Sequence, residues 1–188
     1  MSTELAANYI SLDVAKLMRK QAIRVWVIAS LLVCLWLLLI ITAPLAKAKG
    51  LTAIASPLYY FFSFLCHQIP DRSLHIAGEE FAVCSRCFGI YFGLAVGFAI
   101  YPLWRNIDNT EQLPRFWLFL SLIPMTIDWS LTFFGIWENT HLSRFLTGLI
   151  VGAACSTFIV PALVEITRNL TYRPWTKRSG QNPIGPDR

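Results

Sequence analysis

Thiol and imidazole side chains are concentrated in one short polar segment of this sequence, residues 66–87. The segment reads CHQIPDRSLHIAGEEFAVCSRC and holds three of the chain's five cysteines and two of its three histidines. Cys84 and Cys87 form a C-x-x-C motif, and Cys66 precedes this pair in the same segment. A proline and a glycine in between favour turns that bring Cys66 back to the pair. Converging thiolates of this kind bind metals or attack disulfides.

The C-x-x-C motif stands directly at the start of a long apolar run, which we expect to be a helix. The N-terminus of a helix presents free amide groups and the positive end of the helix dipole. Both favour a thiolate over a thiol, so the thiol groups of Cys84 and Cys87 should be unusually acidic.

The first interpretation of the segment is a metal site. Three thiolates and one imidazole are a common ligand set for structural zinc, which predicts Cys66, Cys84 and Cys87 with one histidine. The histidine would be His67 or His75. Side chains of adjacent residues usually diverge, so His75 has the freer geometry. Zinc is the first expectation by ligand type, and another transition metal such as iron accepts similar ligands.

Two other interpretations stay open. A C-x-x-C motif at a helix start in a four-helix membrane protein resembles the quinone-linked disulfide-forming enzymes, although those use two cysteine pairs. Here Cys66 would resolve a mixed disulfide, which would make the protein a membrane thiol-disulfide oxidoreductase. Alternatively, a disulfide or buried thiols hold a hairpin in a structural or partner-binding subunit.

Further polar residues lie outside the segment. Asp128 falls within an apolar run, where a carboxylate costs a few kcal/mol or more and is by default a functional candidate. Its alternative role is an internal ion pair. Glu138 lies in the following loop, and either acid could serve as a general base beside a catalytic metal. We expect these groups and the cysteine motif to line one polar cavity. Supporting polar residues are Gln68, Arg72, Arg86, Asn139 and Arg144.

Acidic residues and arginines lie close together inside the segment, which predicts local ion pairs. Asp71 directly precedes Arg72, and Glu79 and Glu80 lie between Arg72 and Arg86 in the sequence. We expect pairing among these residues to order the hairpin.

The remaining sequence indicates a membrane protein. Of 188 residues, 55% are hydrophobic and only 14% are charged, and the apolar residues occur in long blocks. Four blocks approach the roughly 20 residues that a spanning helix needs. The net charge of +5 comes mainly from basic residues at the two ends, which indicates topology and no nucleic-acid partner. The four blocks are 25–46, 87–104, 116–137 and 145–166.

A fifth apolar run, 51–65, is too short to cross easily and is rich in aromatic residues, which favour the membrane interface. We therefore predict an all-α integral membrane protein with four transmembrane helices plus one short re-entrant or interfacial helix before a Cys-rich hairpin. The expected domains are a cytoplasmic amphipathic segment 1–24, a transmembrane domain 25–166 and a cytoplasmic disordered tail 167–188. Basic residues at both ends place the termini in the cytoplasm and the hairpin outside the cell membrane.

Small residues recur every fourth position in two of the predicted spans. The stripes allow close backbone contact between helices, which matters in lipid because hiding apolar surface gains nothing there. We expect these two helices to pack against each other, and a homodimer through the same Gly-xxx-Gly faces is the alternative. The stripe residues are Gly89, Gly93 and Gly97 in one span and Gly148, Gly152 and Ser156 in the other.

These motifs resemble an uncharacterised family of small prokaryotic membrane proteins known by a domain-of-unknown-function label. The family's hallmark is CHQ-x-P-x-R-S followed by C-x-R-C-x-G-I-Y. Here CHQIPDRS and CSRCFGIYFG match it, with similarity extending over about half of the chain. The resemblance implies a polytopic membrane protein whose motif residues act together, and it implies no reaction.

Overall fold

The computed structural model describes residues 12–178 and places side chains for residues 15–171. It contains five α-helices, one short 3-10 helix and one β-hairpin within these residues. In chain order the elements are α1 (Leu12–Ala48), α2 (Thr52–Ser63), η1 (Pro70–Arg72), β1 (Ser73–Ile76), β2 (Glu79–Cys84), α3 (Ser85–Trp104), α4 (Phe116–Phe133) and α5 (His141–Arg178).

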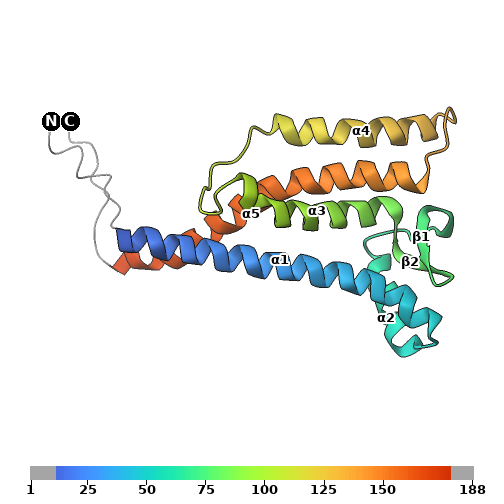
Figure 1. Cartoon of the computed structure of the whole chain (residues 1–188), viewed down its shortest axis with the longest axis horizontal. Coiled ribbons are helices and arrows are strands. Elements are labelled where there is room, and N and C mark those ends of the chain that lie inside the picture. The colour runs from blue at the N-terminus through green and yellow to red at the C-terminus, as the bar shows by residue number, and fades with distance from the viewer. Residues whose placement is uncertain (1–11, 179–188) are drawn as a thin grey trace.

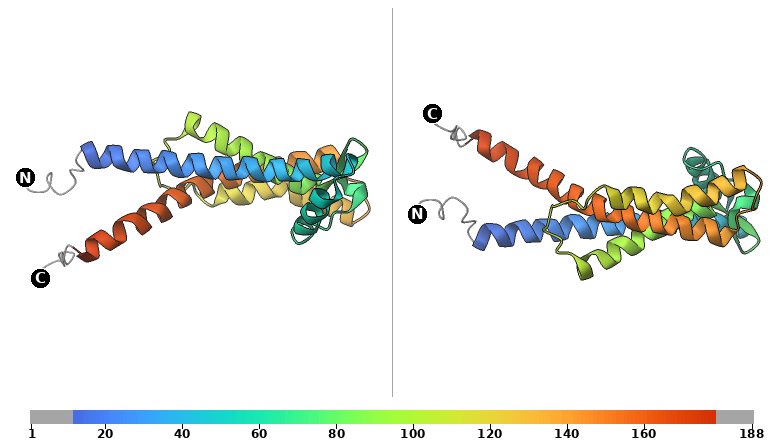
Figure 2. Two further views of the ribbon diagram at one scale, coloured as in Figure 1. Left: turned by 90° about the horizontal axis from the view of Figure 1, so that it is seen from below. Right: turned by 90° about the horizontal axis from the view of Figure 1, so that it is seen from above.

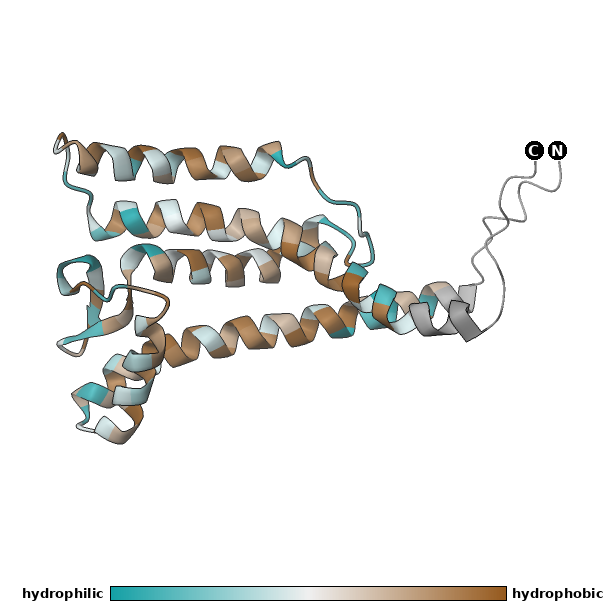
Figure 3. Cartoon of the chain, turned by 180° about the vertical axis from the view of Figure 1, so that it is seen from behind, coloured by the Kyte–Doolittle hydropathy of each residue, from teal (hydrophilic) through white to brown (hydrophobic). Residues whose placement is uncertain are grey.

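Four of the helices are long and apolar enough to cross a membrane, which confirms the prediction of four spans. They lie side by side, with α5 between α3 and α4 and with α1 along the far side of α3 (Figure 1). Figure 3 shows apolar residues along these four helices and hydrophilic residues mainly in the loops and at helix ends. Large apolar side chains of α1, such as Leu31 and Leu38, are exposed and would face lipid.

The short apolar run forms α2, a 12-residue helix that contains Pro57. This helix packs against α1 and β2 at the hairpin end of the bundle (Figure 1). Phe62 is fully buried against α1, whereas Tyr60 and Phe64 are exposed. At about 1.5 Å per residue, 12 residues are too short to cross the hydrocarbon core. The predicted short helix before the hairpin is therefore present.

The two small-residue stripes pack against each other inside the chain. Gly89 and Gly93 of α3 lie against the backbone of α5, and Gly148 and Gly152 of α5 lie against the backbone of α3. A Cβ atom at Gly93 would be only 2.8 Å from the Cα atom of Leu149. The expected packing of the two helices is confirmed. A homodimer through the same stripes would require α3 and α5 to separate.

The predicted Cys-rich hairpin is present and consists of two antiparallel β-strands, β1 and β2. Ile76 pairs with Glu79, and the two-residue turn between them has positive φ at both positions, Ala77 (53°) and Gly78 (83°). Such turns match the natural twist of a hairpin. Lys47 at the end of α1 holds β2 through Glu79, with Nζ 2.8 Å from the carboxylate.

The start of α1 and the end of α5 lie at the end of the bundle opposite to the hairpin (Figure 2). Gln21 of α1 donates hydrogen bonds there to the Thr167 carbonyl (3.2 Å) and the Thr171 hydroxyl (2.9 Å). Helix α5 continues through 167–178, where the sequence predicts a disordered tail, and α1 already begins at Leu12. The rest of the predicted terminal segments, 1–11 and 179–188, lies outside the described residues.

Candidate functional site

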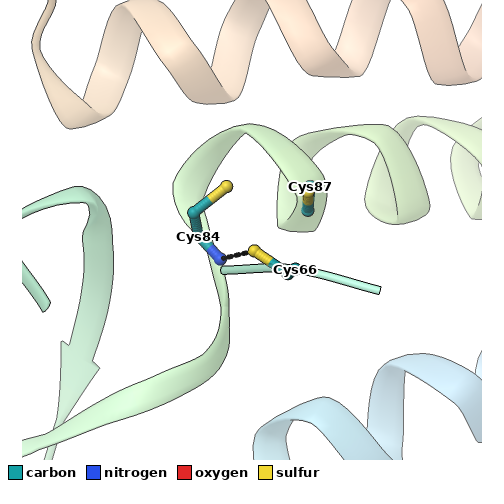
Figure 4. A group of neighbouring side chains, drawn as sticks. All are labelled: Cys66, Cys84 and Cys87. Atoms are coloured by element: carbon teal, nitrogen blue, oxygen red, sulfur yellow. Dashed lines mark hydrogen bonds between the residues drawn. The ribbon is translucent and has the colours of Figure 1, made fainter. Parts of the chain in front are cut away.

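Three cysteines converge at the hairpin end of the bundle (Figure 4). The Sγ atoms of Cys66, Cys84 and Cys87 all lie within 4.8 Å of one another. Cys66 is buried and the other two are half-buried. All three are free thiols, so the convergence does not depend on a disulfide. The sequence prediction that a hairpin brings Cys66 back to the C-x-x-C pair agrees with this arrangement.

Three separate elements position these sulfur atoms. Cys66 follows α2, Cys84 ends β2 and caps α3, and Cys87 lies in the first turn of α3. The backbone amide of Cys84 donates a hydrogen bond to Cys66 Sγ at 3.2 Å, shown as a dashed line in Figure 4. The hairpin is needed because it returns the chain from the end of α2 to the start of α3.

Gln68 fixes the loop that follows Cys66. Its backbone has a φ of 49°, an uncommon conformation for a residue other than glycine. Its side-chain amide donates to the carbonyl oxygens of Tyr59 in α2 (2.7 Å) and Ala82 in β2 (2.8 Å). These two bonds tie the loop to both neighbouring elements and so hold Cys66 beside the C-x-x-C pair.

The surroundings of Cys66 favour its thiolate. Hydrogen bonds from the thiols of Cys84 and Cys87 lower the pKa of Cys66, and the backbone amide of Cys84 lowers it further. Burial raises this pKa, but its effect is smaller than that of the hydrogen bonds. A thiolate is the form that binds a metal or attacks a disulfide.

The two histidines of the segment occupy different places. His67 is exposed and lines a cavity of about 310 Å³ together with all three cysteines. His75 is exposed on β1, where its position in the strand register is opposite Glu80 of β2. The freer geometry expected for His75 therefore does not bring it to the thiols, whereas His67 lines the cavity that contains them.

A second polar cluster connects α3, α4 and α5 next to the thiols. Asp128 accepts hydrogen bonds from Arg86 at 2.5 Å and from the Asn139 side chain at 3.0 Å. Asn139 in turn accepts a bond from Arg144 Nε at 2.6 Å. The carboxylate of Asp128 therefore has an internal ion pair, the alternative role expected for it.

A larger cavity of about 640 Å³ adjoins this cluster and the thiols. Its polar side is formed by arginines, an amide and two of the thiols, and its apolar side comes mainly from α4. Three residues, Arg72, Cys84 and Cys87, line both cavities. The polar lining residues are Arg72, Cys84, Arg86, Cys87, Asn139 and Arg144, together with Thr126 and Thr132 of α4.

One sequence expectation about charged residues needs correction. The predicted local pairing of Arg86 with the hairpin acids is wrong, because Arg86 reaches Asp128 in α4 instead. Glu79 and Glu80 pair with Lys47 of α1. Glu138, a candidate general base, is exposed in the loop between α4 and α5 and lines neither cavity itself, although its neighbour Asn139 lines the larger one.

Sequence reasoning missed one polar contact at this end of the bundle. The Ser85 hydroxyl lies 2.9 Å from His141 Nδ1, and it donates to the Arg72 carbonyl at 3.0 Å. These contacts join the first residues of α3 and α5 to η1. A serine at a helix start is a common local signal, but nothing in the sequence indicates a partner 56 positions away.

Fold and site together define a polytopic helical membrane protein with a thiol cluster at one end of its bundle. The family model described as "Predicted membrane protein (DUF2085)" matches residues 66–158. This range contains all three clustered cysteines and both small-residue stripes. The chain belongs to this family, as the resemblance in the sequence implied.

Two archaeal proteins are similar to part of the chain. An uncharacterized protein of Methanocaldococcus jannaschii is 40% identical over 109 residues, which cover 58% of this chain and 70% of that protein. An uncharacterized protein of Methanothermobacter thermautotrophicus is 36% identical over 91 residues, which cover 48% of this chain and 80% of that protein. No solved structure is significantly similar to the chain.

Proposed function

We propose that this membrane protein binds a transition metal, with zinc as the first choice, through Cys66, Cys84 and Cys87. The observation that supports the proposal is the convergence of three free thiols within 4.8 Å. A zinc–sulfur bond of about 2.3 Å separates the sulfurs of a tetrahedral site by about 3.8 Å. Small rotations of the side chains would bring the three thiols to that spacing.

The fourth ligand position distinguishes a structural from a reactive metal. Structural zinc sites fill four positions with protein ligands, and catalytic sites leave one open. His67 could complete a closed site, because it lines the cavity with the thiols. If His67 stays in solvent, the fourth position faces a cavity and is open to water or substrate.

The experiment that tests this proposal is elemental analysis of protein purified in detergent without oxygen. We expect about one metal ion per wild-type chain and none in Cys84→Ser/Cys87→Ser, because two of three thiolates are then missing. Cys34→Ser/Cys155→Ser is the matched control, since those cysteines lie within α1 and α5, and it should keep the metal. An absence of metal from the wild type would refute the proposal.

A thiol-disulfide oxidoreductase is the second candidate, and the lowered pKa of Cys66 supports it. Oxidation of two of the thiols would release two protons and two electrons to an acceptor of the quinone class. In that case Cys84→Ser should abolish turnover, and a chelator should have no effect. A structural or partner-binding subunit would show neither metal nor turnover, and it would lose only stability in the same variant.

A further inference from the structure

Three guanidinium groups converge on the larger cavity from three different elements. Arg72 comes from η1, Arg86 from the second position of α3 and Arg144 from the fourth position of α5. Like charges repel, so their convergence on one cavity costs free energy unless an anion offsets it. The structure provides one carboxylate here, Asp128, and it is already shared between Arg86 and Asn139.

The positive charge of the cavity is therefore not fully neutralised. Arg144 donates Nε to a neutral amide, Asn139, and the ion pairs formed by the described residues include neither Arg72 nor Arg144. A divalent ion on three thiolates would add one negative charge to the neighbouring site. Even then, three arginines face one carboxylate and that single charge, which leaves one positive charge in excess.

The rest of the cavity lining is mainly apolar and comes largely from a spanning helix. Met125, Trp129 and Phe133 of α4 and Ile90 of α3 form this apolar wall, and Thr126 and Thr132 of α4 also line the cavity. The Trp129 and Phe133 rings are stacked 5.0 Å apart and are 52% and 68% exposed. Exposed rings in a membrane-spanning helix face lipid. The cavity thus joins a cationic surface to a surface that contacts hydrocarbon chains.

Arg86 and Arg144 would also lie near the depth of lipid headgroups. Both are within the first turn of a helix that is long and apolar enough to span, so their guanidinium groups would sit near the end of the hydrocarbon region. A guanidinium binds phosphate oxygens through two parallel hydrogen bonds, which suits it to phosphate recognition. The cavity volume of about 640 Å³ is typical of a small-molecule site.

We propose that this cavity binds a lipid that carries a terminal phosphate group. Arg72 and Arg144 hold the phosphate, and Arg86 remains paired with Asp128. The wall formed by Trp129 and Phe133 contacts the start of the acyl chains. This proposal does not rest on the metal site, because it uses the arginines and the apolar wall alone.

The test is native mass spectrometry of the full chain in an uncharged detergent, with three probes. Phosphatidic acid carries both the phosphate and the chains, diacylglycerol carries the same chains alone, and inorganic phosphate carries the anion alone. We expect phosphatidic acid to bind, and its affinity to fall roughly tenfold or more in Arg72→Gln/Arg144→Gln. Arg115→Gln, an exposed arginine at the opposite end of the bundle, is the matched control and should bind as the wild type does.

Equal binding of phosphatidic acid by the wild type and the double variant would overturn the proposal. Displacement of phosphatidic acid by an equal concentration of inorganic phosphate would also overturn it, because the apolar wall would then contribute nothing. Should the double variant lose its helical content, Arg144→Lys is the second variant, because it keeps the charge and removes the planar fork with its Nε bond to Asn139. We expect it to weaken binding severalfold. Metal content measured in the same samples separates this result from that of the thiol site.

Discussion

At the scale of single residues, the environment of Asp128 determines which role it can take. A carboxylate in an apolar helix suggested a catalytic base, but the structure pairs it with Arg86 at 2.5 Å and with Asn139 at 3.0 Å. The two charged side chains are only 20% and 11% exposed. A carboxylate held in this way links α3 to α4 and fixes the arginine beside the thiols.

Asp128→Asn should therefore lower stability as well as any activity. The substitution leaves the Arg86 charge partly buried without its carboxylate, and we expect a loss of about 1–3 kcal/mol in the free energy of unfolding. Chemical denaturation in detergent, followed by helical circular dichroism, measures this loss. The double variant Arg86→Gln/Asp128→Asn should recover part of the stability, because it removes both charges together. Unchanged stability in Asp128→Asn would return Asp128 to the catalytic candidates.

The residue scale also shows how far the sequence predicts the candidate site. The C-x-x-C spacing and the turn residues were enough to predict that Cys66, Cys84 and Cys87 meet. They did not select between His67 and His75, because that depends on the strand register that places His75 opposite Glu80. Ligand type is a local property, whereas side-chain direction depends on the pairing of the whole hairpin.

At the scale of elements, the contact between α3 and α5 is the most extensive in the molecule. Its geometry was predictable because a four-residue repeat of small side chains has few other uses in lipid. The ion pairs of the hairpin were not predictable. Lys47 lies 32 positions from Glu79 in the sequence, and only the packing of α1 against β2 brings them together.

Gly93→Leu should disrupt the α3–α5 contact. The new side chain would meet the backbone of α5 at Leu149, where a Cβ atom alone already lies too close. Backbone on both sides leaves little room to relax, so we expect a loss of about 3 kcal/mol or more in the free energy of unfolding. Ala99→Leu is the matched control, because Ala99 lies in the same helix and is exposed. The measurement is again unfolding in detergent, and equal stability of the two variants would contradict the close packing.

At the scale of the whole molecule, hydropathy alone predicted the number of spanning helices, and the structure agrees. The residues at which the spanning helices begin and end were less predictable. Helices α1 and α5 continue past their apolar blocks into polar sequence, where Gln21 bonds to Thr167 and Thr171. Apolar length sets how much of a helix lies in lipid, but contact between helices decides where each one ends.

Charge and connectivity together predict the orientation of the bundle in the membrane. The α3–α4 loop lies at the end of the bundle that contains the start of α1, and the α4–α5 loop lies at the hairpin end (Figure 1). Basic residues near both termini predict that the first of these ends is cytoplasmic. The thiol cluster and the arginine-lined cavity would then face the outside of the cell.

Two matched substitutions test this orientation. Glu111 lies in the α3–α4 loop and Glu138 in the α4–α5 loop, and both are exposed acids. In intact cells we expect a membrane-impermeant maleimide to label Glu138→Cys, and to label Glu111→Cys only after lysis. The unsubstituted chain gives the background from the native thiols. The reverse pattern would place the termini outside the cell. The metal proposed for this end of the bundle would then come from the cytoplasm, and the proposed phosphate-bearing lipid from the cytoplasmic leaflet.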